Sequence, residues 1–228
     1  MPWFRAAPNG QNSGKLERQA LSDEHYGSAA WNLPLTEADY FVIDIETSGF
    51  SPQTDLVLSV ASLQTSWHSN EPDLEICHDL VGHADLSRVP QHIWPLTGLT
   101  PEILHGKPEW HDVLFNTLKR AQSRVWIAHH ARHELAFLQK STQDFWRFQL
   151  RPIVVDTALV AQALTGSSTV PVLEEVCSLF DVPLGARHRA DEDVKMTAMV
   201  WMKEAKLCKA LGLTTVGQVV EWTLAGQH

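Results

Sequence analysis

The amino-acid sequence predicts an α/β domain built on a mixed five-stranded sheet with helices on both faces. Three strand patterns come first, at about 40–46, 57–68 and 74–81, with no helix between them, and they fit an antiparallel meander. Two further strand patterns, at 124–128 and 151–156, alternate with helices, which is typical of parallel strands. Together these observations predict three antiparallel strands followed by parallel strands.

The first strand pattern, FVIDI from Phe41 to Ile45, is apolar at both odd and even positions, as in a strand that is buried on both faces. Asp44 interrupts this pattern and Glu46 follows it. Residues i and i+2 of a strand point to the same face, so these two carboxylates lie together. Neighbouring like charges raise each other's pKa unless a cation lies between them. The pair is therefore either a solvated strand end or part of a metal site.

Helices are predicted from capping residues and from the spacing of apolar positions. Thr100 is placed to cap a short helix that has Pro101 at its first position. Longer helices are expected at about 108–121 and 131–140. Four more helical patterns lie at about 157–164, 171–180, 189–206 and 215–224.

Two later stretches place polar groups where helices begin. Glu134 lies in the first turn of the helix after the fourth strand, near the edge where mixed sheets often carry active groups. His188 precedes a late helix, and Asp193 lies in the first turns of that helix. A histidine at a helix N-terminus tends to be neutral, and neutral imidazole can take a proton from water. Both stretches are also typical of ordinary polar helix starts, so two interpretations stay open.

Composition and charge limit the class of protein. The chain of 228 residues is 44% hydrophobic and has a formal net charge of −9. This acidic balance argues against a protein that coats DNA with basic side chains, but not against one whose bound divalent cations supply positive charge. The sequence shows no apolar run of membrane-spanning length and no secretory signal. Three cysteines without a CxxC pair fit a reduced, cytoplasmic setting.

Residues 1–38 differ from the rest of the chain. They are rich in Gly, Asn, Gln, Ser and Pro and have no sustained apolar periodicity, apart from a candidate short helix at 15–21. We therefore expect an N-terminal extension that is partly ordered, followed by a domain at 39–228 that ends in C-terminal helices.

Three motifs, in this order along the chain, resemble those of the DnaQ-like 3′–5′ exonucleases of the DEDDh type. VIDIETSGF (42–50) resembles the first motif of the family, DxETTG. IAHHARHELAFL (127–138) resembles the second, AHNAxFDxxFL, and RHRADEDVKMTA (187–198) resembles the third, RHxAxxDAxxTA. Two subsidiary stretches are also similar to the family, LTGLTPEIL (96–104) and VVDTALVAQAL (154–164).

The resemblance spans about residues 40–205 and implies an RNase H-like fold. It also implies hydrolysis of single-stranded nucleic acid, DNA more than RNA, from the 3′ end with release of nucleoside 5′-monophosphates. Two divalent metal ions, Mg²⁺ or Mn²⁺, are the implied cofactors. Carried over position by position, the metal ligands are Asp44, Glu46, Glu134 and Asp193, and the general base is His188. The implied substrate contacts are Thr47, Ser48, Gly49, Phe50 and His129.

The second motif departs from the family pattern at three positions. His130 stands where the family has Asn, and His133 and Glu134 stand where it has Phe and Asp. Glutamate is one methylene longer than aspartate, so its oxygens lie about 1.5 Å farther from the backbone. Because Mg²⁺ requires a near-ideal octahedron, the longer side chain indicates a shifted site and some preference for Mn²⁺.

Three alternatives stay open at this point. One keeps the fold and changes the substrate, to give an RNA-trimming or oligoribonuclease-like enzyme. Another is a weakly active, polymerase-accessory binding module, for which Glu134 is the argument and a DNA polymerase the partner. The third is a zinc site made by His129, His130 and His133, which the order H-x-x-H-E does not favour.

The biological role is equally open, because proofreading, DNA repair and nucleotide salvage all use this family's fold. Since only two helices are expected after Asp193, without a longer tail, we expect a stand-alone exonuclease.

Overall fold

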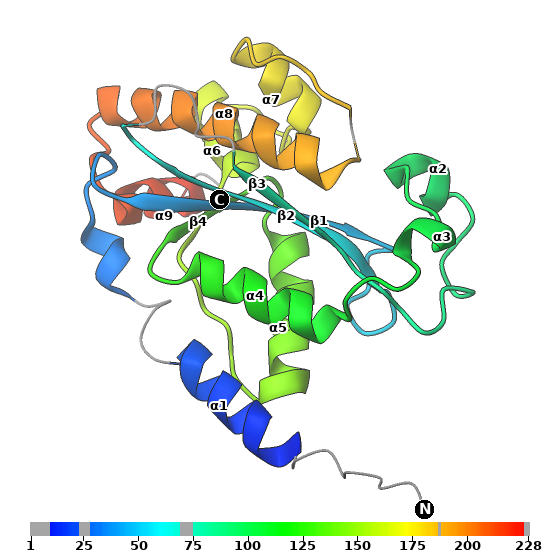
Figure 1. The fold of residues 1–228 in the computed structure, drawn as a ribbon. Helices are drawn as coiled ribbons and strands as arrows, with labels where there is room; N and C mark the ends of the chain where they lie inside the picture. The colour runs from blue at the N-terminus through cyan, green and yellow to red at the C-terminus, as the bar shows by residue number, and fades with distance from the viewer. Residues whose placement is uncertain (1–9, 23–27, 69–74, 187, 226–228) are drawn as a thin grey trace, which may run out of the picture.

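The computed structural model describes residues 10–22, 28–68, 75–186 and 188–225. Figure 1 shows a central twisted sheet with helices above and below it. This arrangement confirms the predicted α/β architecture with helices on both faces of the sheet.

The sheet has the strand order β3-β2-β1-β4-β5. Its strands are β1 (Asp39–Thr47), β2 (Val57–Ser66), β3 (Ile76–Leu80), β4 (Val125–Ala128) and β5 (Val154–Asp156). The first three pair antiparallel, whereas β4 runs parallel to β1 and β5 runs parallel to β4. The predicted order of three antiparallel strands followed by parallel strands is therefore confirmed, and the carboxyl ends of β1, β4 and β5 meet at one edge.

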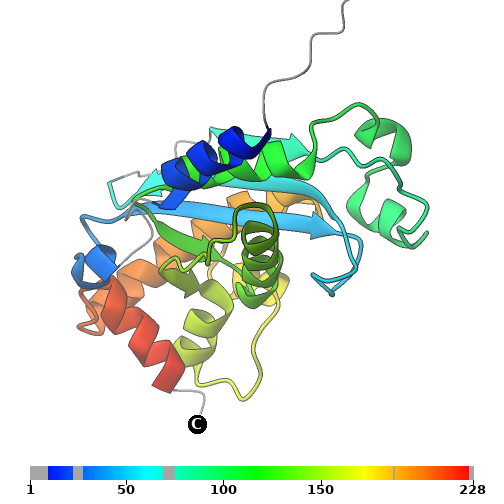
Figure 2. The ribbon, with the colours of Figure 1, turned by 90° about the horizontal axis from the view of Figure 1, so that it is seen from below.

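Two layers of helices cover the sheet. The upper layer in Figure 1 contains α6 (Thr157–Thr165) and α8 (Ala190–Ala210), with α7 (Leu173–Leu179) packed on both. The last helix, α9 (Val216–Ala225), is drawn at the level of the sheet and packs on β5, α6 and η1. The lower layer, which Figure 2 shows from below, contains α1 (Gly10–Ser22), α4 (Trp110–Ala121) and α5 (Arg132–Trp146). Three short elements complete the description, namely η1 (Ser28–Asn32), α2 (Ile93–Thr97) and α3 (Pro101–Leu104).

The central strand β1 has two apolar faces because a core lies on each side of it. Phe41, Ile43 and Ile45 face the layer of α4 and α5. Tyr40 and Val42 face α8, where the Tyr40 ring packs edge-on against Trp201 at 5.4 Å between ring centroids. Because side chains alternate along a strand, the even-numbered positions that follow also face α8. This register directs Asp44 and Glu46 toward the start of α8.

The N-terminal part of the described chain packs on the domain. In α1, Leu21 is fully buried in the core shared with α4 and α5, and Glu17 accepts a 3.0 Å hydrogen bond from the Trp146 indole. Leu35 is also fully buried, next to α9. The division of the chain at residue 39 stays a prediction.

Several element boundaries differ from those predicted. α5 continues six residues beyond Lys140, because the hydroxyls of Ser141 and Thr142 bond to preceding carbonyls of the helix and leave the helix intact. β5 begins only at Val154, since Pro152 has no N–H to donate to a neighbouring strand. No helix in the described ranges combines the length and the apolar character that crossing a bilayer would require.

Candidate active site

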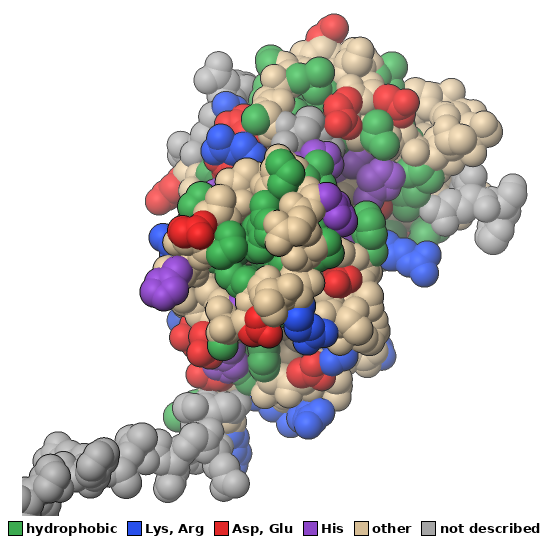
Figure 3. Space-filling model, turned by 90° about the vertical axis from the view of Figure 1, so that its right-hand side faces the viewer, with side chains coloured by type: hydrophobic (Ala, Val, Ile, Leu, Met, Phe, Trp, Pro, Cys, Tyr) green, Lys and Arg blue, Asp and Glu red, His purple; other side chains and the backbone are tan. Residues whose placement is uncertain are grey.

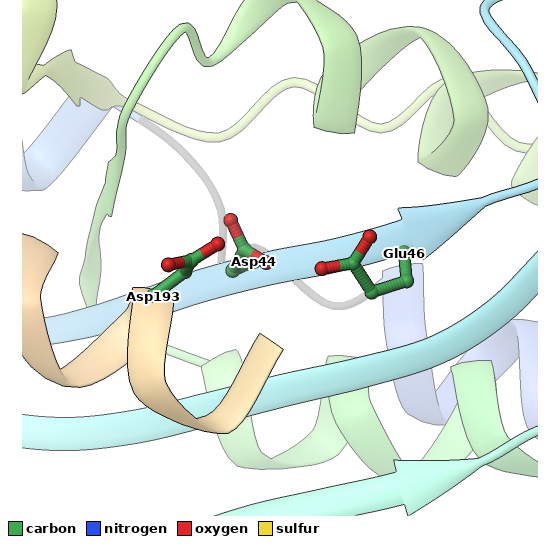
Figure 4. A group of neighbouring side chains, drawn as sticks. All are labelled: Asp44, Glu46 and Asp193. Atoms are coloured by element: carbon green, nitrogen blue, oxygen red, sulfur yellow. The ribbon is translucent and has the colours of Figure 1, made fainter. Parts of the chain in front are cut away.

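Three carboxylates from two distant parts of the chain meet at the end of the central strand. Asp44 and Glu46 come from β1, and Asp193 comes from the first turn of α8. One ligand oxygen of each lies within 4.8 Å of the others, and Figure 4 shows the three side chains turned toward a common space. Asp193 is only 4% exposed and the other two are half-buried. This set of hard oxygen donors is suited to a divalent cation.

The position of Asp193 follows from how α8 begins. The helix starts at Ala190, which is fully buried against the sheet together with Val194 and Ala198. His188, just before the helix, has a left-handed backbone with φ of 59°. Its backbone N–H donates to Oδ2 of Asp193 at 3.1 Å. The backbone entering α8 therefore fixes the direction of the Asp193 carboxylate.

The fourth predicted ligand, Glu134, lies beside this cluster and is not one of its three members. Its side chain is 5% exposed, in the first turn of α5, and its Oε2 atom has no hydrogen-bond partner among the described residues. Burial raises the pKa of Glu134 to about 8, and the negative charges of Asp156 and Glu46 add to the rise. In the metal-free protein, burial thus favours the protonated form of the Glu134 carboxyl group.

The predicted general base, His188, lines the same cleft as the cluster and is exposed. The structure thus places His188 in the same cleft as Asp44, Glu46 and Asp193. Glu134 comes from α5, in the helical layer on the other face of the sheet, and is close enough to Glu46 to feel its charge. Among the described residues, the structure does not bring His129, His130 and His133 into a group that could hold a metal, which argues against the zinc interpretation.

Asp156 has a part in the site that sequence reasoning missed. Its carboxylate accepts hydrogen bonds from three backbone amides, those of His130 (3.0 Å), Ala131 (2.9 Å) and Ala158 (3.0 Å). It therefore caps α6 and at the same time holds the turn between β4 and α5, in which His130 has a left-handed φ of 56°. In the sequence, an Asp directly before a helix predicts an N-cap. It does not predict the hydrogen bonds to the His130 and Ala131 amides.

His129 is held by the residue that follows Asp156. The Thr157 hydroxyl donates to the carbonyl oxygen of Ala128 at 3.3 Å and lies 2.9 Å from Nδ1 of His129. The Thr157 side chain thus contacts both the backbone of β4 and the His129 ring. Thr157 is fully buried, which makes the orientation of the His129 ring a fixed feature of the cleft.

Thr157→Val is expected to release His129, a predicted substrate contact, and to lower activity by up to about 10²-fold, since a small misplacement of such a contact costs that much. It should also cost about 1–3 kcal/mol of stability, since Nδ1 of His129 loses its hydrogen-bond partner. Thr165→Val, near the end of the same helix, removes a hydroxyl that bonds within α6 and serves as the control. Rates and urea unfolding measure both effects, and equal rates in the two variants would contradict the prediction.

The turn after β1 holds the predicted substrate contacts in a cross-linked conformation. The Ser48 hydroxyl accepts from the Leu56 amide at 2.9 Å, and Asp55 accepts from the Ser51 amide at 2.8 Å. The Asp55 carboxylate lies directly under Gly49, where an added Cβ would come within 2.4 Å of Oδ2. Only glycine fits at this position without displacing Asp55. Phe50, at the tip of the turn, is 92% exposed.

The cluster and the turn share one cleft of about 280 Å³. Five of the residues that line it are histidines, and Figure 3 shows histidine side chains gathered around a recess on this face. They are His92, His129, His130, His133 and His188. Sequence reasoning assigned no role in the site to His92, or to Leu96 and Thr97 of α2, which also line this cleft. No Lys or Arg is among the described residues that line it.

The fold and this carboxylate cluster define the class of protein, which is a nuclease with an RNase H-like domain. Residues 41–201 match the family model for exonucleases, and this range covers most of the chain. The chain belongs to the exonuclease family, and this confirms the resemblance of its three motifs.

Known relatives are longer proteins that the chain matches in part. It is 27% identical over 181 residues to the 3′–5′ exonuclease DinG of Staphylococcus haemolyticus, covering 79% of this chain and 19% of that protein. It is 28% identical over 163 residues to the PolC-type DNA polymerase III of Clostridium perfringens, covering 71% of this chain and 11% of that protein. The chain therefore spans less than a fifth of the length of these relatives.

A solved structure with a similar fold is the zinc-bound complex of E. coli ExoI with single-stranded DNA. Its TM-score is 0.63 at 17% identity, and the match covers 78% of this chain and 42% of that chain. At this identity the likeness supports the fold, which agrees with the predicted RNase H-like architecture.

Proposed function

We propose that this protein is a metal-dependent 3′–5′ exonuclease that shortens single-stranded nucleic acid, DNA in preference to RNA, and releases nucleoside 5′-monophosphates. The observation that carries the proposal is the set of three carboxylates from β1 and α8 whose ligand oxygens lie within 4.8 Å. Two comparisons support the substrate. One relative is described as a 3′–5′ exonuclease, and a solved structure with the same fold holds single-stranded DNA.

The side chains at the site fit divalent cations. Carboxylate oxygens are the ligands that Mg²⁺ and Mn²⁺ prefer, and three like charges so close together require a compensating charge. No cationic Lys or Arg side chain lines the described part of the cleft to supply it. Asp44, Glu46 and Asp193 would hold the cations, with Glu134 as a further ligand once it is ionised. When bound, two such cations stabilise the charge that develops on the phosphate by several kcal/mol and lower the pKa of the attacking water.

Other residues of the chain would orient the substrate and move the proton. His188, exposed at the cleft, is placed to take the proton of the attacking water, and such general-base catalysis contributes roughly 10²–10⁴-fold. The Thr47–Phe50 turn lies at the cleft beside the carboxylates and would close the site behind the last nucleotide. Base stacking on Phe50, worth roughly 1–3 kcal/mol, does not depend on the base, which suits an enzyme that removes every nucleotide in turn.

The partner and the biological role belong to the same proposal. A match to a PolC-type DNA polymerase III supports a role in proofreading or repair beside a DNA polymerase. The altered second motif, with Glu134 outside the compact carboxylate set, instead favours a weakly active binding module as the second candidate.

A strand-shortening assay separates these candidates. Single-stranded DNA and RNA oligomers labelled at the 5′ end are incubated with the protein and Mg²⁺ or Mn²⁺. We expect a ladder that shortens from the 3′ end, faster on DNA, and that disappears in EDTA and in Asp44→Ala. The absence of metal-dependent shortening on either polymer would refute the exonuclease proposal, and tight binding without shortening would establish the binding module.

A further inference from the structure

His133 stands where the second motif of the resembling family has Phe, and its ring contacts both the core and the turn after β1. It is half-buried in the first turn of α5, on the wall of the cleft. Its Nε2 atom lies 3.2 Å from the hydroxyl oxygen of Thr47, which belongs to the turn after β1. A phenylalanine could fill this space but could not make this polar contact.

The other hydrogen bond of the Thr47 hydroxyl determines which atom donates in its contact with His133. The Thr47 hydroxyl donates its one proton to the carbonyl oxygen of Gly49 at 2.7 Å. It must therefore accept at its contact with His133, and Nε2 of His133 is the donor. Nε2 of His133 therefore carries the proton that is shared with Thr47. The bond joins α5 to the Thr47–Phe50 turn.

The same ring supports Phe50. His133 packs against Phe137 at 5.0 Å between ring centroids, and Phe137 is 2% exposed in the core. His133 also meets Phe50 edge-on, at 5.7 Å between ring centroids. The three rings thus form a series that runs from the core to the mouth of the cleft. Phe50 is 92% exposed, and the contact with His133 restricts where its ring can lie.

We propose that His133 is a positioning residue that fixes the Thr47–Phe50 turn and holds the Phe50 ring as a platform for the base of the 3′-terminal nucleotide. This inference rests on the proposed exonuclease function and assigns the role of a residue outside the metal cluster. His133 acts through Thr47 and Phe50 and touches no reacting atom.

Two variants and two substrates test this role. His133→Ala removes both the hydrogen bond and the ring, whereas His133→Phe keeps a ring and removes only the hydrogen bond. The substrates are a single-stranded DNA with 2-aminopurine as its 3′-terminal base and the same oligomer with an abasic 3′-terminal nucleotide. KM and kcat are measured for each combination. Direct binding of the 2-aminopurine oligomer is followed separately by its fluorescence in Ca²⁺.

For His133→Ala we expect KM on the 2-aminopurine substrate to rise about tenfold with kcat little changed, because a hydrogen bond and an aromatic contact are both lost. On the abasic substrate the rise should be much smaller, since no base is present to stack. His133→Phe should lie between the wild type and His133→Ala. His105→Ala, at an exposed histidine after α3, is the control and should match the wild type.

Several outcomes would overturn the inference. They are an equal rise in KM on both substrates, a fall in kcat with KM unchanged, or wild-type values in both His133 variants. A wild type that shortens neither substrate would refute the exonuclease proposal instead. In that case the fluorescence measurement still decides the role of His133, because the wild type must bind the 2-aminopurine oligomer more tightly than His133→Ala.

Discussion

Asp193→Asn is expected to reduce exonuclease activity by at least about 10³-fold and, in the absence of metal, to make the protein more stable. A bound cation stabilises the transition state by several kcal/mol. If Asp193→Asn weakens binding of that cation, the rate falls accordingly. The gain in stability follows because Asp193 is 4% exposed and its carboxylate lies within 4.8 Å of those of Asp44 and Glu46. Removing one of three neighbouring like charges relieves their repulsion.

The expected size of the gain is small because two effects oppose each other. Relief of repulsion at this distance is worth about 2–4 kcal/mol at most in a partly solvated site. Asp193 also lies in the first turn of α8, where the helix dipole favours a negative charge by about 0.3–1 kcal/mol. We therefore expect the melting temperature in EDTA to rise by a few degrees, since about 1 kcal/mol corresponds to about 2–4 °C for a chain of this size.

Added Mn²⁺ should reverse this order. The wild type gains stability by binding the cation, whereas the Asp193→Asn variant gains little. Melting curves with and without Mn²⁺ measure both effects, and Asp39→Asn, at an exposed position at the start of the same strand β1, is the control. Equal metal-induced shifts in the wild type and in Asp193→Asn would show that the cluster is not the cation site.

Glu204→Gln is expected to stabilise the protein at neutral and alkaline pH. Glu204 lies in α8, is fully buried, and has no hydrogen-bond partner for either carboxylate oxygen among the described residues. Burial, together with the negative charge of Asp156, raises the pKa of Glu204 well above its usual value. The folded protein therefore keeps Glu204 protonated at a pH at which the unfolded chain has released that proton.

The pH dependence has a definite sign. Because the folded state binds the proton more tightly, the free energy of unfolding of the wild type falls as pH rises above about 4.3, the unfolded value. The fall continues, at up to about 1.4 kcal/mol per pH unit, until the folded pKa is reached. Glutamine has nearly the same shape and does not titrate, so Glu204→Gln should escape this loss. Between pH 5 and 7 the advantage of the variant should widen by up to about 3 kcal/mol.

Urea unfolding at several pH values measures this gap. Glu221→Gln, at an exposed position in α9, is the matched control and should follow the wild type at every pH. If the difference in the free energy of unfolding between Glu204→Gln and the wild type does not change with pH, Glu204 is ionised in the folded protein. In that case it would need a cationic partner inside the fold.

The candidate metal ligands of β1 could be predicted because their positions depend on local sequence alone. A strand whose odd and even positions are both apolar is buried on both faces, as a central strand is. The alternation of its side chains puts Asp44 and Glu46 on one face. The start of α8 near Asp193 could likewise be predicted from the helical pattern that follows it. The resemblance of the three motifs to one family then predicted that these two segments contribute to the same site.

The walls of the cleft could not be predicted, because they depend on contacts between distant segments. α2 has five residues with Pro95 in the middle, a pattern too short to show periodicity, and its Ile93 is buried with Leu58 of β2. That packing brings His92 and Leu96 to the cleft. The contacts of Asp156 are a second example. The local sequence predicts that Asp156 caps α6, but not that it accepts hydrogen bonds from the amides of His130 and Ala131.

The central claim is that the carboxylates of Asp44, Glu46 and Asp193 hold the divalent cations at which a 3′-terminal nucleotide is released. The most direct test is a crystal structure of the protein soaked with Mn²⁺ and a nucleoside 5′-monophosphate, with anomalous scattering to locate the metal. We predict manganese peaks bound by these three carboxylates, with the phosphate of the nucleotide on the metals and its base beside Phe50. Manganese bound elsewhere, or a nucleotide with its phosphate away from the three carboxylates, would contradict the account.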